Sequence, residues 1–243
     1  MTLTDEPFAV EELYIAMQPI VDLMRGRVFA HEALLRSEAP SFTGPLPILQ
    51  EAVRSGTMGT LGRHLRDMSL RACPTTPLFI NVHPSEFDHG WLVRPDDPIF
   101  AHDHAVYLEI TESVPLSHYR LCHSVLREIR SKGVMLAVDD LGAGYSNLKY
   151  IADLAPEMVK LDRELIAGLT TDSRTHKLIC HIVRLCTELG AGVIAEGIET
   201  QEELEAVAAA GIRFVQGYLI ARPAFPMPSV NVEAIRGVRP ASR

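Results

Sequence analysis

The amino-acid sequence lacks long apolar segments and any sign of a secretory leader. No apolar run approaches the roughly 20 residues that a helix needs to span a bilayer. The opening residues, MTLTDEPFAVEELY, show neither the basic start nor the apolar centre of a signal peptide. We therefore expect a soluble, cytoplasmic protein with no membrane partner.

Cysteine is scarce, and no CxxC pair is present among Cys73, Cys122, Cys180 and Cys186. Isolated thiols of this kind are typical of reduced, mostly buried side chains. His176 lies one helical turn before Cys180, but no second closely spaced pair completes a zinc site. We therefore interpret both residues as packing residues.

Basic residues are outnumbered by acidic ones. The chain has 23 Lys and Arg against 31 Asp and Glu, which gives a formal net charge of −8. This balance argues against binding to a nucleic acid polymer, because such binding requires the neutralisation of many phosphates. A small anionic ligand is still compatible with the sequence if bound cations screen the carboxylates.

Eight short, apolar, β-rich runs predict strands at residues 14–20, 26–35, 77–82, 105–111, 133–140, 157–162, 191–196 and 212–217. Helical patterns separate the later runs, at residues 117–133, 172–190 and 200–211. The last pattern opens with a capping box, Thr200 to Glu203. This alternation favours a TIM-type (β/α)8 barrel. A doubly wound open sheet is the alternative, but no GxGxxG motif follows the first strand.

Two stretches fit this pattern poorly. Residues 36–76 begin with a segment rich in Pro, Gly and Ser and give no clear alternation. The chain after Pro226 contains further Pro and Arg residues, and we expect it to be loose.

Polar residues stand at or near the ends of the predicted strands from the second to the eighth. In chain order they are Glu32, Asn81, Glu109 with Glu112, Asp139 and Asp140, Lys160 and Asp162, Glu196 with Glu199, and Gln216. In a β/α barrel these ends meet on one face. Carboxylates crowded there need compensation, which divalent Mg²⁺ or Mn²⁺ can provide through oxygen ligands. A pair of such ions suits phosphoryl displacement, with Lys160 placed to orient a hydroxide.

Each of these residues has an ordinary structural explanation when taken alone. Asp162 could cap a helix, Glu199 could begin one, and Asn81 could satisfy backbone groups. The recurrence of buried charge at strand after strand favours a metal site over a series of unrelated caps and turns.

Seven ordered motifs resemble those of the EAL domain family, a bacterial phosphodiesterase module that acts on cyclic di-GMP. They are MQPIVDLMRGRVFAHEALLR, which contains the Glu-Ala-Leu of the family name, FINVHP, LEITES, AVDDLGAGYSNL, VKLDREL, VIAEGIET and VQGYLIARP. The resemblance runs from about Leu13 to Pro223 and implies a modified TIM barrel with one antiparallel strand. We place the domain at 13–226, between an N-terminal tail at 1–12 and a C-terminal tail at 227–243.

The resemblance also implies roles for individual residues. The implied ligands are Glu32, Asn81, Glu109 and Asp139 for a first metal, and Asp139, Asp140 and Glu196 for a second. Lys160 matches the catalytic lysine, supported by Asp162, and Glu32 and Glu196 also belong to the catalytic set. The implied substrate contacts are Gln18, Arg36, Asn81, Asp139, Lys160 and Gln216. Coupling between the loop after the fifth strand and a dimer is implied for Glu112, Glu199, Gly142 and Gly144.

We therefore expect hydrolysis of cyclic di-GMP to linear pGpG with two Mg²⁺ or Mn²⁺ ions, inhibition by Ca²⁺, and a homodimer. No GGDEF, PAS, GAF or receiver segment fits in the remaining residues, so control would come from dimerisation, metal supply, expression or a separate regulatory protein. Two departures from the pattern of many members are DDLGAGYS at 139–146, which is expected to tune the site, and SEAP at 37–40, where the guanine-pocket details of the family do not carry over. The alternatives are a catalytically silent effector that binds cyclic di-GMP and a protein-interaction module.

Overall fold

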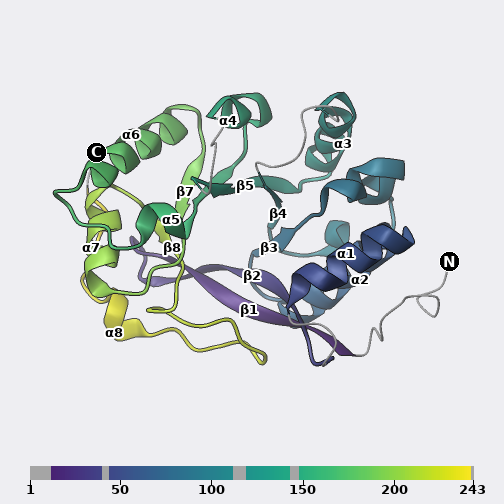
Figure 1. Cartoon of the computed structure of the whole chain (residues 1–243), viewed down its shortest axis with the longest axis horizontal. Helices are drawn as coiled ribbons and strands as arrows, with labels where there is room; N and C mark the ends of the chain where they lie inside the picture. Colours follow the sequence, from purple (N-terminus) through teal and green to yellow (C-terminus); the bar gives the residue numbers. More distant parts are fainter. Residues whose placement is uncertain (1–11, 40–43, 112–118, 143–147, 242–243) are drawn as a thin grey trace.

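A closed eight-stranded barrel forms the centre of the computed structural model, which describes residues 12–39, 44–111, 119–142 and 148–241 (Figure 1). Its strands follow chain order around the barrel: β1 (Leu13–Asp22), β2 (Arg27–Ser37), β3 (Leu78–Asn81), β4 (Val106–Thr111), β5 (Met135–Leu141), β6 (Met158–Leu161), β7 (Gly192–Ala195) and β8 (Phe214–Val215). This confirms the barrel and excludes the open sheet.

One strand runs against the others. β1 pairs antiparallel with both of its neighbours, β2 and β8, whereas every pairing from β2 round to β8 is parallel. The expectation of a single antiparallel strand is therefore confirmed. The reversal follows from the tight turn after Asp22, because a short turn joins β1 to β2 as a hairpin and a parallel pair would require a crossover.

Helices surround the barrel: α1 (Pro45–Ser55), α2 (Met58–Ala72), the 3₁₀ helices η3 (Pro84–Val93) and η4 (Pro98–Ala101), α3 (Tyr119–Ser131), α4 (Leu148–Leu154), α5 (Arg163–Ile166), α6 (Arg174–Glu188), α7 (Gln201–Ala209) and α8 (Val232–Ile235). Figure 1 shows α1 to α3 along one side of the barrel and α6 to α8 along the opposite side. The predicted capping box of α7 is present, with reciprocal bonds between Thr200 and Glu203. Among the described residues, none of these helices is both long and apolar enough to cross a bilayer.

Two of the helices that the sequence did not predict, α1 and α2, lie in the stretch 36–76. On α2, Gly59, Gly62 and Arg66 share the buried face with two large apolar side chains, which obscures the helical pattern. A Cβ at Gly59 would lie 2.2 Å from the Trp91 ring, so the glycine lets the indole lie against the helix. Arg66 is fully buried and pairs with the carboxylates of η3 and η4, including Asp97 at 2.7 Å.

An apolar layer closes the interior of the barrel near the start of the parallel strands. This layer, here called the apolar floor, consists of Ile20, Ala30, Phe79, Tyr107, Ala137, Met158 and Ile194 with the partly buried Phe29 and Phe214. The rings of Phe79 and Tyr107 stack with centroids 4.3 Å apart and planes 7° from parallel. A larger apolar layer lies between the strands and the surrounding helices.

The segment after Pro226 is joined to the barrel, in contrast to the loose tail that we expected. Ile235 of α8 is buried in the outer apolar layer. Ala241 N–H donates to Ala208 O at 2.9 Å, and Arg239 Nη1 donates to Leu23 O at 3.0 Å. These contacts connect α7 and the β1–β2 turn to residues near the end of the chain, which the polar composition of the tail does not suggest. The domain boundary at 226 stays a prediction.

The barrel seam between β1 and β8 depends on Asp22, because these strands share only two residue pairs. The buried carboxylate accepts bonds from Arg213 Nε at 2.9 Å and Nη2 at 2.6 Å. It also accepts the N–H groups of Met24 and Arg25. Burial acts to raise the pKa of Asp22, but these donors outweigh it and lower the pKa below its ordinary value.

We predict that Asp22→Ala lowers the free energy of unfolding by about 2 kcal/mol at neutral pH, a figure reduced for the partial exposure of Arg213. Because the pKa of the carboxyl is depressed, its contribution is present above the ordinary value of 3.8 and is lost as the pH falls below it. Urea denaturation from pH 7 to pH 3 should therefore show the two proteins converging. Asp67→Ala, which breaks an exposed pair on α2, is the control and should change stability by less than about 1 kcal/mol.

Candidate active site

Polar side chains form a second layer inside the barrel, two residues further along each strand than the apolar floor. The pairs are Ala30 and Glu32, Phe79 and Asn81, Tyr107 and Glu109, Ala137 and Asp139, Met158 and Lys160, Ile194 and Glu196, and Phe214 and Gln216. Side chains alternate between the two faces of a strand, so a step of two residues keeps the same inward direction. On the reversed strand β1 the order is inverted, and Gln18 precedes Ile20.

Lys160 lies at the centre of this layer and is the cation that its carboxylates share. Its Nζ atom is 2.5 Å from Glu109 Oε1 and 2.6 Å from Glu196 Oε1. Asp139 Oδ1 lies at 3.2 Å and Glu32 Oε1 at 3.5 Å. Lys160 and Glu109 are both 1% exposed, so solvent screens this group weakly.

Amide groups also contact the carboxylate of Glu32. Gln216 Nε2 donates to Glu32 Oε2 at 2.6 Å and to Gln18 Oε1 at 3.0 Å. Gln18 Nε2 in turn donates to Ala221 O at 3.1 Å, and Asn81 Nδ2 reaches Glu32 Oε1 at 3.4 Å. The predicted residues Gln18, Asn81 and Gln216 are thus brought together around Glu32.

Burial and neighbouring charges shift the pKa values of several residues in the polar layer. Burial raises the pKa of Glu109 well above its ordinary value, and the neighbouring carboxylates add to the effect although Lys160 opposes it. Burial also raises the pKa of Glu196. Burial alone would lower the pKa of Lys160, but the carboxylates around it, Asp139 first, hold it well above the usual range. Lys160 is therefore an ammonium at neutral pH.

Asp139, Asp140 and Glu196 bring one oxygen each to a common point, with these atoms within 4.8 Å of one another. Asp140 adopts a left-handed φ of 60°, which is strained for a residue with a side chain. Burial, with Asp139 beside it, raises the pKa of Asp140 to about 6. The N–H of Asp140 donates to Asp139 Oδ1 at 3.0 Å, which fixes the two carboxylates relative to each other.

This donor set fits divalent cations. We call Glu32, Glu109, Asp139, Asp140 and Glu196 the acidic cluster. When all five are ionised, one ammonium leaves a formal charge of −4, which two divalent ions would match. Oxygen-only ligands suit Mg²⁺ and Mn²⁺, and the buried Glu109 Oε2 accepts no hydrogen bond and is available to such an ion.

Other predicted residues lie around this centre with contacts of their own. Asp162 caps α5, with Oδ1 accepting Glu164 N–H at 2.7 Å. Glu199 forms an ion pair with Arg163, and Arg36 Nη1 donates to Leu35 O at 2.8 Å. The predicted roles of Asp162, Glu199 and Arg36 stay predictions.

The loop after β5 is described only in part. Gly142 has a φ of 112°, a conformation that favours glycine. The predicted coupling residues Glu112 and Gly144 lie outside the described residues.

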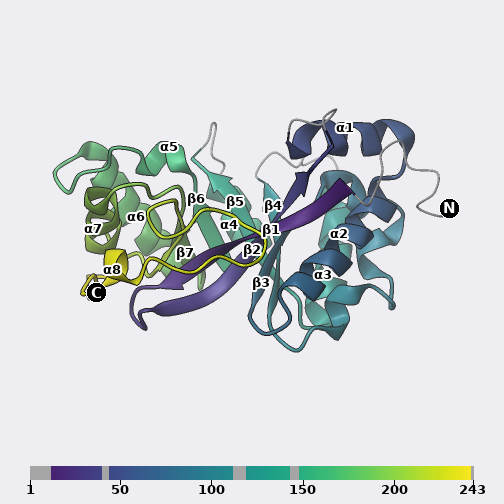
Figure 2. The same ribbon diagram turned by 90° about the horizontal axis from the view of Figure 1, so that it is seen from below.

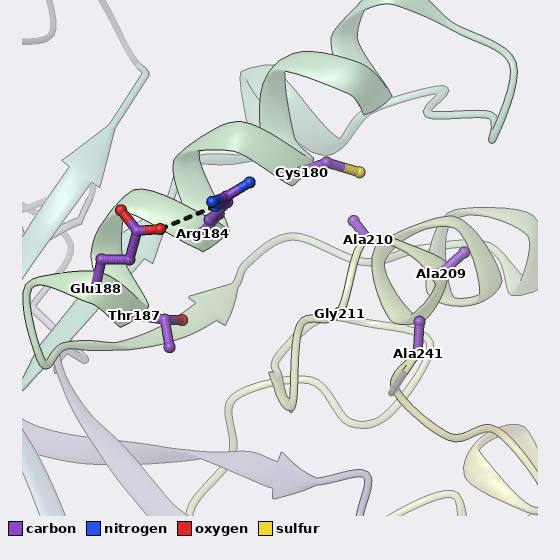
Figure 3. Close-up of a pocket in the computed structure, with 8 residues that line it drawn as sticks. All are labelled: Cys180, Arg184, Thr187, Glu188, Ala209, Ala210, Gly211 and Ala241. Carbon is purple, nitrogen blue, oxygen red and sulfur yellow. Dashed lines mark hydrogen bonds and ion pairs between the residues drawn. The ribbon is translucent and has the colours of Figure 1, made fainter. Parts of the chain in front are cut away.

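A separate hollow between α6, α7 and the C-terminal segment contains none of the predicted site residues (Figure 3). It is lined mainly by small side chains, with Cys180 and the ion pair of Arg184 and Glu188 on α6. His176 Nε2 lies 3.1 Å from Ala206 O, while its Nδ1 atom is 3.8 Å from Cys180 Sγ. These contacts agree with the interpretation of His176 and Cys180 as packing residues.

A TIM-type barrel with a carboxylate-rich layer at the C-terminal ends of its strands defines a class of proteins that bind divalent cations at this face. Within that class the chain belongs to the EAL domain family, whose model matches residues 4–223.

Relatives and solved structures agree with this membership. The chain is 34% identical over 241 residues to the cyclic di-GMP phosphodiesterase PA2567 of Pseudomonas aeruginosa, covering 93% of this chain and 41% of that protein. Klebsiella pneumoniae BlrP1, solved as a manganese and cyclic di-GMP complex, matches with a TM-score of 0.75 and 29% identity, over 89% of this chain and 57% of that one. A standalone EAL protein from Vibrio cholerae O395, bound to cyclic di-GMP, matches with a TM-score of 0.73 and 26% identity, over 91% and 97% of the two chains. The chain spans less than half the length of the curated relatives it matches.

The sequence did not reveal several residues that pack against, or bond to, the segments next to the acidic cluster. Leu165 packs on Gly142, the stem of Arg163 lies on Gly197, and the carboxylate of Glu203 accepts three backbone N–H groups. Glu203 was recognised only as part of a capping box, because spacing along the chain reports local bonds and not bonds between loops.

We predict that Lys160→Met lowers the free energy of unfolding by about 3 kcal/mol without divalent ions, because buried carboxylates lose their cation. Since the pKa values of Glu109 and Glu196 are raised, these groups become neutral more readily as the pH falls, and the deficit should shrink from pH 8 to pH 5. Guanidinium denaturation measures this trend, and Mn²⁺ should restore much of the loss. Lys149→Met, on an exposed α4 pair, is the control. An equal deficit at every pH would contradict the shared-cation arrangement.

Proposed function

We propose that the protein is a metal-dependent phosphodiesterase that hydrolyses cyclic di-GMP to linear pGpG. The observation that carries this proposal is the acidic cluster, which gathers five carboxylates around Lys160 at one end of an EAL barrel. The named activity of PA2567 and the cyclic di-GMP complexes of structural neighbours support the choice of substrate.

The residues divide into two ligand groups that share Asp139. Glu32, Asn81, Glu109 and Asp139 would hold a first divalent ion, and Asp139, Asp140 and Glu196 a second. When bound, such a pair of ions lowers the pKa of a water and stabilises charge on a phosphoryl group. The manganese and calcium complexes of BlrP1 support ions of this type.

The side chains of this chain then bind the nucleotide, position the attacking oxygen and stabilise developing charge. We assign to Lys160 the positioning of the attacking oxygen and the stabilisation of negative charge that develops on the phosphate. Because its ammonium is buried and surrounded by carboxylates, it stays protonated and acts as a fixed positive charge rather than as a base. Gln18, Gln216 and Arg36 are assigned to the substrate, with the guanidinium of Arg36 suited to a phosphate.

A catalytically silent effector would need the same nucleotide site without the means to hydrolyse. Here every position of the implied ligand set carries an oxygen donor and the lysine is in place, so the geometry favours the enzyme. Product formation separates the two functions, because an effector returns intact cyclic di-GMP after long incubation with Mn²⁺ or Mg²⁺. Failure to bind the nucleotide at all would indicate a protein-interaction module.

Several further assignments belong to this proposal. The resemblance supports a homodimer, and a separate regulatory protein and a cytoplasmic location are further proposals. The roles of Glu112, Glu199, Gly142 and Gly144 in coupling the loop after β5 to a dimer are proposed on the same ground.

We predict that Glu32→Ala reduces kcat/KM for cyclic di-GMP by about a thousandfold or more, since loss of a metal ligand removes several kcal/mol of transition-state stabilisation. Chromatography of the product in Mn²⁺ measures the loss. Glu233→Ala, which removes an exposed carboxylate on α8, should keep the wild-type rate. A near-wild-type rate for the Glu32 variant would refute the ligand assignment.

Replacement of Mn²⁺ by Ca²⁺ should suppress turnover while leaving the nucleotide bound. Calcium takes more ligands at longer distances, about 2.3–2.6 Å, and fits the close Asp139, Asp140 and Glu196 triangle poorly. Parallel calorimetry and product assays would show binding without hydrolysis. Equal rates with both ions would argue against a geometry-sensitive metal centre.

A further inference from the structure

The one-turn helix α5 lies near the ends of β5 and β6 (Figure 2), and its contacts reach both segments that carry the Asp139, Asp140 and Glu196 triangle. It follows β6, on the side of the barrel where β5 and β6 end. Both sides of the helix touch segments that contain an assigned metal ligand. The helix itself is anchored by Ile166, which is fully buried.

On one side α5 contacts the end of β5. The Asp162 N–H donates to Leu141 O at 3.1 Å, which ties the start of α5 to the residue after Asp140. Leu165 lies directly on Gly142, because a Cβ there would come within 2.4 Å of Leu165 Cδ1. The leucine therefore limits how far the end of β5 can move toward β6.

On the other side α5 contacts the loop after β7. The stem of Arg163 lies against Gly197, where a Cβ would come within 2.6 Å of the Arg163 Cβ and Cγ atoms. Its guanidinium forms an ion pair with Glu199. Gly197 directly follows Glu196, so this contact limits the position of the third member of the triangle.

Glu203 fixes that loop to the far end of α5. Its carboxylate, on a residue that is 6% exposed, accepts Gly168 N–H on Oε1 at 2.8 Å. Oε2 accepts the N–H groups of Glu199 at 2.8 Å and Thr200 at 3.1 Å. One buried side chain thus joins the segment after α5 to the segment after Glu196, and three charge-assisted bonds make this a strong connection.

We infer that α5 is a spacer that sets the distance between the Asp139–Asp140 pair and Glu196, with Leu165 and Glu203 as its positioning residues. This inference deepens the proposed function, since it rests on the assignment of these three carboxylates to the second ion. Glu32, Asn81 and Glu109 lie on strands that α5 does not contact in the bonds described above, so the spacer acts mainly on the second ion and reaches the first only through the shared Asp139.

Two variants test the spacer from opposite sides. Leu165→Ala removes the contact with Gly142. Glu203→Gln keeps one oxygen that can accept the N–H groups of the α7 cap. It places an NH₂ group opposite the Gly168 N–H, so only the hydrogen bond to the segment after α5 is lost. Leu189→Ala, just after α6, and Glu202→Gln, on α7, change exposed residues and serve as matched controls.

Calorimetric titration with Mn²⁺ should show that one of two binding steps weakens about tenfold in both variants, as expected for loss of an outer support, while the other step, which shares only Asp139 with it, changes much less. Unchanged affinity at both steps, or equal weakening of both in a protein of lowered thermal stability, would overturn the inference.

Hydrogen exchange without metal provides a readout that does not depend on the proposed function. In each variant, exchange should quicken in peptides covering both 136–142 and 193–200, although each substitution lies on one side of α5. Faster exchange on the substituted side alone, or in neither peptide, would overturn the spacer. If wild-type protein bound no Mn²⁺ and released no pGpG, the proposed function would fail, and the exchange pattern would still decide whether α5 couples the two segments.

Discussion

Charge compensation inside a closed barrel is the constraint on which this structure depends. Five carboxylates point into a space that the apolar floor bounds on one side and that solvent reaches poorly. Such a group can persist only with cations in fixed positions, because like charges in a weakly screened interior otherwise neutralise or move apart. Lys160 provides one fixed charge, and its contact with four carboxylates from four other strands requires that the barrel close in a single register.

The reversed strand β1 has a different part in this arrangement. It brings the neutral amide of Gln18 to the polar layer, where the parallel strands bring mostly charged groups. A chain of hydrogen bonds from Ala221 through Gln18 and Gln216 to Glu32 then crosses the seam between β1 and β8. Because β8 is only two residues long, these side-chain bonds and the pair of Asp22 with Arg213 supplement a short ladder of backbone bonds.

Much of this arrangement was predictable from the sequence, because its signals are local. Apolar runs that end in carboxylates predicted the strands and the face on which Glu32, Asp139 and Glu196 meet, and the motifs predicted the reversed strand. The helix α2 was not predictable in this way, since two glycines and the buried Arg66 occupy much of the face that normally carries large apolar residues. The hydrogen bond between Glu203 and Gly168 and the packing of Leu165 on Gly142 join segments whose proximity exists only after the barrel has closed. The composition of the segment after Pro226 likewise did not predict its attachment to the barrel, which depends on the burial of Ile235.

The stacked rings of the apolar floor have a consequence for the movement of molecules. With Phe79 and Tyr107 in face-to-face contact and Phe29 and Phe214 beside them, the barrel is closed at that end. Any solute that reaches the carboxylates must enter and depart through the same opening, at the ends of the parallel strands. A molecule can therefore enter only after the previous one has left, and slow release of the bound molecule delays the binding of the next.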